Sequence, residues 1–112
     1  MNNKIHYAPE AQNDLDEIWE YISFDLSNPQ AAENTVNKIL DRIDALENFS
    51  EIGAPLSSVT EVESDYRFLV SGNYMVFYRV TGKDVYIDRV LYSRCDYLRI
   101  LFSNLPQYDN EQ

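Results

Sequence analysis

The sequence predicts an α+β protein in which an N-terminal strand and a helical hairpin pack on an antiparallel sheet of about four strands, followed by a short C-terminal helix. Three observations lead to this class. Two segments in the first half carry apolar residues at helical spacing, residues 66–97 alternate at period two, and glycine-containing turns divide that second stretch. The predicted order is strand, two helices, three strands and a helix, within a single domain over residues 1–112.

The chain begins with a short candidate strand over residues 4–7 and then a helix. Pro9 takes the first helical position, where its missing N–H costs nothing, although Ala8 is a poor N-cap. The helix should run to about Leu26, because apolar residues recur at helical spacing and acidic residues occupy the other positions. The stripe expected to face inward is Leu15, Ile18, Trp19, Ile22 and Leu26.

A second helix starts at once, with Asn28 as a good N-cap and Pro29 at the first helical position. Because so short a linker joins the two helices, they should form an antiparallel hairpin. Residues 48–65 then break both periods and predict a long loop with room for one helical turn. The second apolar stripe is Ala32, Val36, Ile39, Leu40, Ile43 and Leu46.

Residues 66–92 predict a three-stranded antiparallel meander. A two-residue turn at Gly82-Lys83 would pair Val80 with Val85 and Val76 with Arg89, and residues 71–73 give a second turn. We expect Arg89 to pair with an acid of the first helix, because an unpaired buried arginine is very costly. The parity expected to face the helices is Tyr74, Val76, Tyr78, Val80, Val85, Ile87 and Leu91.

The opposite parity mixes apolar, tyrosine and arginine side chains, which is typical of a binding surface. The alternative is that this face is half-buried under the C-terminal helix. That helix would be capped by Ser93 or Asp96 and would reach Phe102. Residues 103–112 are expected to be a flexible polar tail. The side chains of the expected open face are Met75, Phe77, Arg79, Tyr86, Asp88, Val90, Tyr92 and Arg94.

Charge and composition exclude several classes of protein. A net charge of -10 argues against nucleic-acid binding through overall charge, although residues 66–102 carry six basic and three acidic residues. Cys95 is the only cysteine, so an intramolecular disulfide is impossible. The chain shows no apolar leader and no apolar run of about 18 residues, so we expect a cytoplasmic protein without membrane contact. Asp16 and Glu20 suit a solvated helix face better than a metal site, and no cofactor is expected.

The helical hairpin followed by Tyr66-Arg67, NYMVFYRV and DVYIDRVLYSRCDY resembles the RelE/ParE superfamily of toxins from type II toxin-antitoxin systems, and the opening YAPEAQNDLDEIWEYI fits too. The resemblance covers residues 4–102. It implies a helical hairpin on an antiparallel sheet and a toxin of a plasmid-stabilisation system. It also implies a small cognate antitoxin that wraps the toxin through hydrophobic grooves and basic patches. The acidic charge is a departure, because many relatives are basic.

RelE-like members of this superfamily cleave mRNA on the ribosome, and the resemblance lets their site be compared with this chain. Arg67 and Arg94 match basic positions, and Tyr97 is a candidate general acid or base for this metal-independent chemistry. Two expected basic positions hold Leu69 and Met75 instead. Each lost contact to the transition state can cost about a hundredfold in rate, so these residues argue against ribonuclease activity.

ParE-like members instead inhibit DNA gyrase and need no catalytic residues. The segment RVLYSRCD resembles their arginine-rich last strand, with Arg94 and Asp96 as the best match and Arg89 in a supporting role. The alternative for this pair is that Asp96 caps the last helix and Arg94 neutralises a neighbouring acid. The residues implied in target or antitoxin binding are Met75, Phe77, Arg79, Tyr92, Arg94 and Asp96.

We therefore favour a ParE-like gyrase inhibitor that a cognate antitoxin neutralises. One alternative is a nuclease that uses Arg67, Arg94 and Tyr97, and another is a non-toxic interaction module. Convergence of Arg67, Arg79 and Arg94 in one cleft would favour the nuclease, whereas scattered positions would favour binding. The sequence leaves the oligomeric state open.

Overall fold

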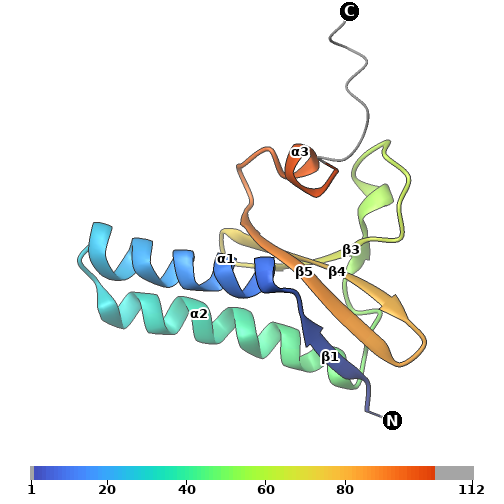
Figure 1. Ribbon diagram of the computed structural model, residues 1–112, viewed down its shortest axis with the longest axis horizontal. Coiled ribbons are helices and arrows are strands. Elements are labelled where there is room, and N and C mark those ends of the chain that lie inside the picture. The colour runs from blue at the N-terminus through green and yellow to red at the C-terminus, as the bar shows by residue number, and fades with distance from the viewer. Residues whose placement is uncertain (1, 103–112) are drawn as a thin grey trace, which may run out of the picture.

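Five strands form one sheet in the order β1-β5-β4-β3-β2 in the computed structural model, which describes residues 2–102 (Figure 1). The α+β fold is confirmed. The sheet has one strand more than expected, because two residues of the predicted loop pair with the start of β3. The strands are β1 (Lys4–Tyr7), β2 (Ala54–Pro55), β3 (Arg67–Ser71), β4 (Tyr74–Thr81) and β5 (Asp84–Tyr92).

The sheet is antiparallel, as predicted, except at one edge. There β1 runs parallel to β5, with Lys4 opposite Asp84 and Tyr7 opposite Ile87. Period-two alternation determines which face a side chain takes but carries no information about strand direction. The sequence could therefore place β1 in the sheet without giving its orientation.

Both turns of the meander form as predicted. Ser71 pairs with Tyr74 around Gly72, and Thr81 pairs with Asp84 around Gly82. The two glycines have φ values of 58° and 61°, in the left-handed region that residues with a Cβ adopt at a cost.

A β-bulge in β5 changes the predicted register. Val80 pairs with Val85 as expected, but Phe77 lies opposite Arg89 and Tyr78 lies opposite Ile87, so Asp88 is an extra residue in β5. The expected pairing of Val76 with Arg89 is therefore wrong, and Val76 pairs with Val90. Beyond the bulge the faces exchange, so Val90 packs under the helices and Leu91 packs on the other face.

The helical hairpin covers one face of the sheet and consists of α1 (Pro9–Glu20), a π-helical turn η1 (Tyr21–Asp25) and α2 (Pro29–Asp44) (Figure 1). Asn28 caps α2 as predicted, since its side chain accepts a hydrogen bond of 3.1 Å from the Ala31 N–H. The predicted inward stripe is wrong at Trp19 and Leu26, which are exposed.

The helix-side core fills the space between the hairpin and the sheet. The 3₁₀ turn η2 (Ala45–Glu47) after α2 contributes to it, and the second apolar stripe lies mostly there as expected. The largest fully buried residues of this core are Ile39, Ile43, Leu46, Leu69, Val76, Tyr78, Val85, Ile87 and Val90.

A smaller core lies on the other face, under α3 (Tyr97–Leu101) and the 3₁₀ turn η3 (Leu56–Ser58). Its buried members are Leu56, Met75, Phe77 and Leu91. The expected open surface is therefore wrong at Met75 and Phe77, because α3 folds back over them. The predicted tail over residues 103–112 lies outside the described residues.

Candidate interaction site

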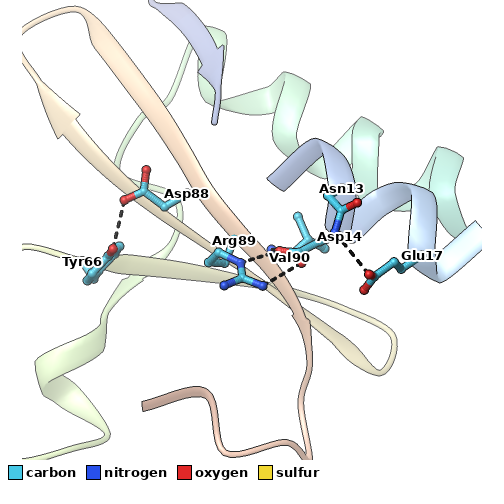
Figure 2. Close-up of polar contacts among 7 residues, drawn as sticks. All are labelled: Asn13, Asp14, Glu17, Tyr66, Asp88, Arg89 and Val90. Carbon is cyan, nitrogen blue, oxygen red and sulfur yellow. Dashed lines mark hydrogen bonds and ion pairs between the residues drawn. The ribbon is translucent and has the colours of Figure 1, made fainter. Parts of the chain in front are cut away.

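The hairpin is fastened to the sheet by a buried carboxylate. Asp14 of α1 is 5% exposed, and its two oxygens accept hydrogen bonds of 2.8 Å from Nε and Nη2 of Arg89 (Figure 2). The backbone N–H of Val90 donates a third bond of 2.9 Å to the same carboxylate. The hydrogen bond with Asp14 raises the pKa of Arg89 above its ordinary value. The expected pairing of Arg89 with an acid of the first helix is confirmed.

We call the Asp14–Arg89 ion pair the latch. It borders a groove of about 1000 Å³ between the helical hairpin and one end of the sheet. Its lining residues come from α1, η1, α2, the β3–β4 turn, the end of β5 and, at Ile100, α3. Its lining is mixed. The apolar contributions come from Ile18, Ile22, Leu26, Val90 and Leu91, and the polar ones from Glu17, Thr35, Lys38, Asn73 and Arg89.

Three tyrosines line the same groove. The rings of Tyr74 and Tyr92 lie edge to face, with centroids 6.0 Å apart, across the first pair of the β4–β5 ladder. Burial, followed by the neighbouring Tyr21 and Tyr92, raises the pKa of Tyr74. A tyrosine combines a large apolar face with a polar tip, so these side chains suit a groove that receives a partner's side chains. The sequence alone did not indicate this role for Tyr21 and Tyr74.

The side chain of Arg67 forms hydrogen bonds with main-chain carbonyls. Its Nε and Nη2 donate hydrogen bonds of 3.0 and 2.7 Å to the carbonyl of Gly53, and Nη2 also reaches the carbonyl of Glu51. Tyr78, which pairs with Arg67 across the strands, holds the same loop by accepting from the Gly53 N–H and donating to the Ser50 carbonyl. Arg67 therefore braces a loop in this structure.

Arg79 belongs to a cluster on the opposite face. Its Nε lies 2.8 Å from the carboxylate of Asp88, the bulge residue, and its guanidinium lies over the ring of Tyr66. The Tyr66 hydroxyl donates to the same carboxylate at 2.9 Å (Figure 2). Burial and the contact with Asp88 raise the pKa of Tyr66 to about 12. The pair with Asp88 offsets the charge that Arg79 could offer to a phosphate.

The end of β5 and the start of α3 carry the other predicted residues. Tyr92 and Arg94 are exposed, and within residues 2–102 Arg94 takes part in no ion pair. Asp96 caps α3 by accepting from the Arg99 N–H, which confirms its predicted capping role. Tyr97 packs its ring against that of Phe77, with centroids 5.1 Å apart.

The structure does not bring the three predicted arginines together. Arg67 shares the helix-side face with its cross-strand partner Tyr78, whereas Arg79, the next residue after Tyr78, lies on the other face. Arg94 follows β5 beyond Tyr92, at the end of the β4–β5 ladder remote from Arg79. Leu69 and Met75, at the two positions where ribonuclease relatives would be basic, are buried in the two cores.

Two other kinds of site are absent from the described part of the chain. Residues 2–102 contain no group of three or more metal-ligating side chains suited to an ion. None of their helices is long and apolar enough to cross a membrane.

Comparison with known proteins shows that this chain is similar to bacterial toxins. A family model described as the ParE toxin of type II toxin-antitoxin systems matches residues 5–97. Toxin ParE1 of Mycobacterium tuberculosis is 32% identical over 97 residues, which cover 86% of this chain and 95% of that protein.

Solved structures share the fold. A chain of the chromosomal ParDE TA system from P. aeruginosa has a TM-score of 0.68 and 25% identity, over 80% of this chain and 95% of that one. A chain of the toxin-antitoxin complex RelBE2 from Mycobacterium tuberculosis has a TM-score of 0.55 and 17% identity, over 82% and 99% of the two chains.

Proposed function

Because this chain belongs to the ParE toxin family of type II toxin-antitoxin systems, we propose that it stops growth by binding DNA gyrase and that a cognate antitoxin neutralises it. The surface that would bind the target includes Tyr92, Arg94 and Asp96, at the exposed junction between β5 and α3. The relatives described as ParDE and RelBE2 assemblies support a protein antitoxin as the partner.

One observation carries the choice of binding over RNA cleavage. Cleavage needs cations around the scissile phosphate and a group that moves a proton. In this chain Arg67 donates to backbone carbonyls, Arg79 is paired with Asp88, and Tyr97 packs against Phe77. Arg67 lies on the helix-side face of the sheet, whereas Arg79 and Tyr97 lie on the other face, so one phosphate could not contact all three.

The groove beside the Asp14–Arg89 latch is the site we assign to the antitoxin. It combines an apolar floor with Glu17, Lys38 and Arg89, so a segment with apolar side chains and a few placed charges would match it. The binding roles predicted for Met75 and Phe77 would require α3 to move, because both residues are buried beneath it.

Induced expression in a bacterial host tests the target. The expected result is growth arrest with relaxed plasmids and intact transcripts, because gyrase supplies negative supercoils. Arg94→Ala should relieve the arrest, while Arg42→Ala, at an exposed arginine of α2 outside this surface, should leave it unchanged. Cut transcripts, or an arrest that Arg94→Ala does not change, would contradict the proposal.

Co-expression with the product of a small reading frame beside this gene tests the groove. Lys38→Glu should retain toxicity but lose rescue by the antitoxin, because Lys38 is an exposed residue of the groove. Lys4→Glu, an exposed lysine of β1 outside the groove, serves as the matched control. Equal rescue of both variants would show that the antitoxin does not bind in this groove.

A further inference from the structure

The tip of the helical hairpin exposes a cluster of large apolar side chains. Trp19, Tyr21, Phe24 and Leu26 are 37%, 51%, 67% and 55% exposed, and we call them the hairpin-tip patch. They are four of the ten large hydrophobic residues that are exposed among those described. Such a concentration within eight residues marks an interaction surface more often than scattered exposed apolar residues do.

The π-helical turn creates this patch. The Leu26 N–H donates to the Tyr21 carbonyl at 3.1 Å, an i to i+5 bond that takes one residue more than an α-helical turn. In an α-helix residue i+5 lies about 140° around the axis from residue i. Here the wider turn brings Phe24 against Trp19, edge to face, with ring centroids 5.8 Å apart.

Part of the patch faces away from the groove. Tyr21 and Leu26 line the groove, but Trp19 and Phe24 do not. An antitoxin segment seated in the groove would therefore leave the Trp19–Phe24 pair available. Because Phe24 is mostly exposed, its large side chain contributes little burial to the fold.

The charge of the helical hairpin indicates which kind of partner the hairpin-tip patch would bind. Residues 9–37 carry seven acidic residues and no basic one. Three of these acids are exposed in α1 and η1, next to the patch: Asp16, Glu20 and Asp25. A second copy of the chain would bring like charges together, and a membrane with anionic lipids would be repelled. A partner that combines apolar and basic side chains would gain from both features.

We propose that the hairpin-tip patch docks a cationic amphipathic segment of a partner protein. Aliphatic side chains would pack on Trp19 and Phe24, while lysine or arginine side chains would meet Asp16, Glu20 and Asp25. A cation can also lie over the indole face. Tyr21 and Leu26 border the groove assigned to the antitoxin, but Trp19 and Phe24 do not line it. Because Lys38→Glu tests the groove and Phe24→Ser tests the patch, either proposal can fail without the other.

Trp19 is the only tryptophan of the chain and lies within the patch, so its fluorescence reports binding directly. The probe is a synthetic helix of about 18 leucine and lysine residues with the leucines on one face. Titration should shift Trp19 emission to the blue and saturate. A peptide of equal charge with serine in place of leucine should bind about tenfold more weakly.

Matched variants locate the binding. Phe24→Ser should weaken the leucine–lysine peptide about tenfold, whereas Phe49→Ser, at a 68% exposed residue of a distant loop, should leave affinity within about twofold. The double variant Glu20→Lys, Asp25→Lys should also weaken binding. Circular dichroism checks that each variant is folded.

Three results would overturn the proposal. Equal binding of the leucine and serine peptides would show that charge alone attracts the probe. Equal effects of Phe24→Ser and Phe49→Ser would place binding elsewhere. Sedimentation that shows a concentration-dependent dimer of this chain, lost in Phe24→Ser, would make a second copy the occupant.

Discussion

Asp14 is a carboxylate that the fold buries almost completely, and three donors make this tolerable. Two come from Arg89 and one from the Val90 backbone, so both oxygens are satisfied. A buried charge costs several kcal/mol unless it is paired and hydrogen-bonded. The bulge at Asp88 is what brings Arg89 and the Val90 N–H to the same carboxylate.

Removal of this carboxylate should destabilise the protein. Asp14→Ala leaves the partly buried Arg89 without its partner and should lower the unfolding free energy by about 2 to 4 kcal/mol. Asp16→Ala, at an exposed acid of the same helix, should change it by less than about 0.5 kcal/mol. Urea denaturation of both variants measures the difference. Similar midpoints for the two would show that the latch contributes no stability.

Tyr66 should make stability depend on pH in the alkaline range. Burial and the hydrogen bond to Asp88 raise the pKa of Tyr66 from 10 to about 12, so the folded state holds this proton more tightly than the unfolded state. The contribution is fully present below pH 10. It is lost as the pH rises to about 12, because the unfolded chain ionises first.

Tyr66→Phe should reduce this alkaline loss of stability and remove from the ultraviolet titration a phenol that ionises at about pH 12. Tyr86→Phe is the control, since Tyr86 is an exposed tyrosine of the same sheet. Unchanged titration curves in Tyr66→Phe would show that Asp88 does not hold the proton of this hydroxyl.

At the scale of elements, the boundaries set by local chemistry were predictable. Asn28 and Pro29 start α2, and Gly72 and Gly82 close the two turns, because each residue acts on its own backbone. The π-helical turn and the β-bulge were not predicted. Both insert a residue whose position depends on packing between distant segments, which helical and strand periodicities do not encode.

The cap of α2 offers a direct test at this scale. Asn28→Ala should lower the unfolding free energy by about 1 kcal/mol, because the Ala31 N–H loses its acceptor. Asn28→Asp should keep most of the stability, since aspartate accepts the same bond. Thermal unfolding followed by circular dichroism compares the two. If both variants lose the same amount, a contact other than the cap is responsible.

At the scale of the whole molecule, the order of elements and the superfamily followed from the sequence, but most of the site did not. The sequence left open whether Arg67, Arg79 and Arg94 converge in one cleft. The structure separates them by sheet face and by distance along the strands, and Met75 and Phe77 lie under α3. The groove joins residues from both helices of the hairpin, three strands and α3, so no single motif marks it.

The net charge of -10 should make stability depend on salt. Like charges repel more strongly in the compact state, and salt screens exposed charges over about 10 Å at 0.1 M. We expect the urea midpoint to rise between about 0.02 and 0.3 M sodium chloride. The variant Asp16→Lys, Glu20→Lys reduces the negative charge by four units and should respond less. An equal response would show that screening of this self-repulsion is not the cause.

The parallel pairing of β1 with β5 also determines when the chain can fold during its own synthesis. Lys4 to Tyr7 meet strand partners at Asp84 to Ile87, and Asp14 meets Arg89. Translation delivers those partners only after the helical hairpin, β3 and β4, so the nascent chain cannot complete the sheet until β5 has emerged. The finished groove and the β5–α3 junction therefore form together and late. A nascent polypeptide that has not yet reached the end of β5 would therefore present neither surface in its folded form.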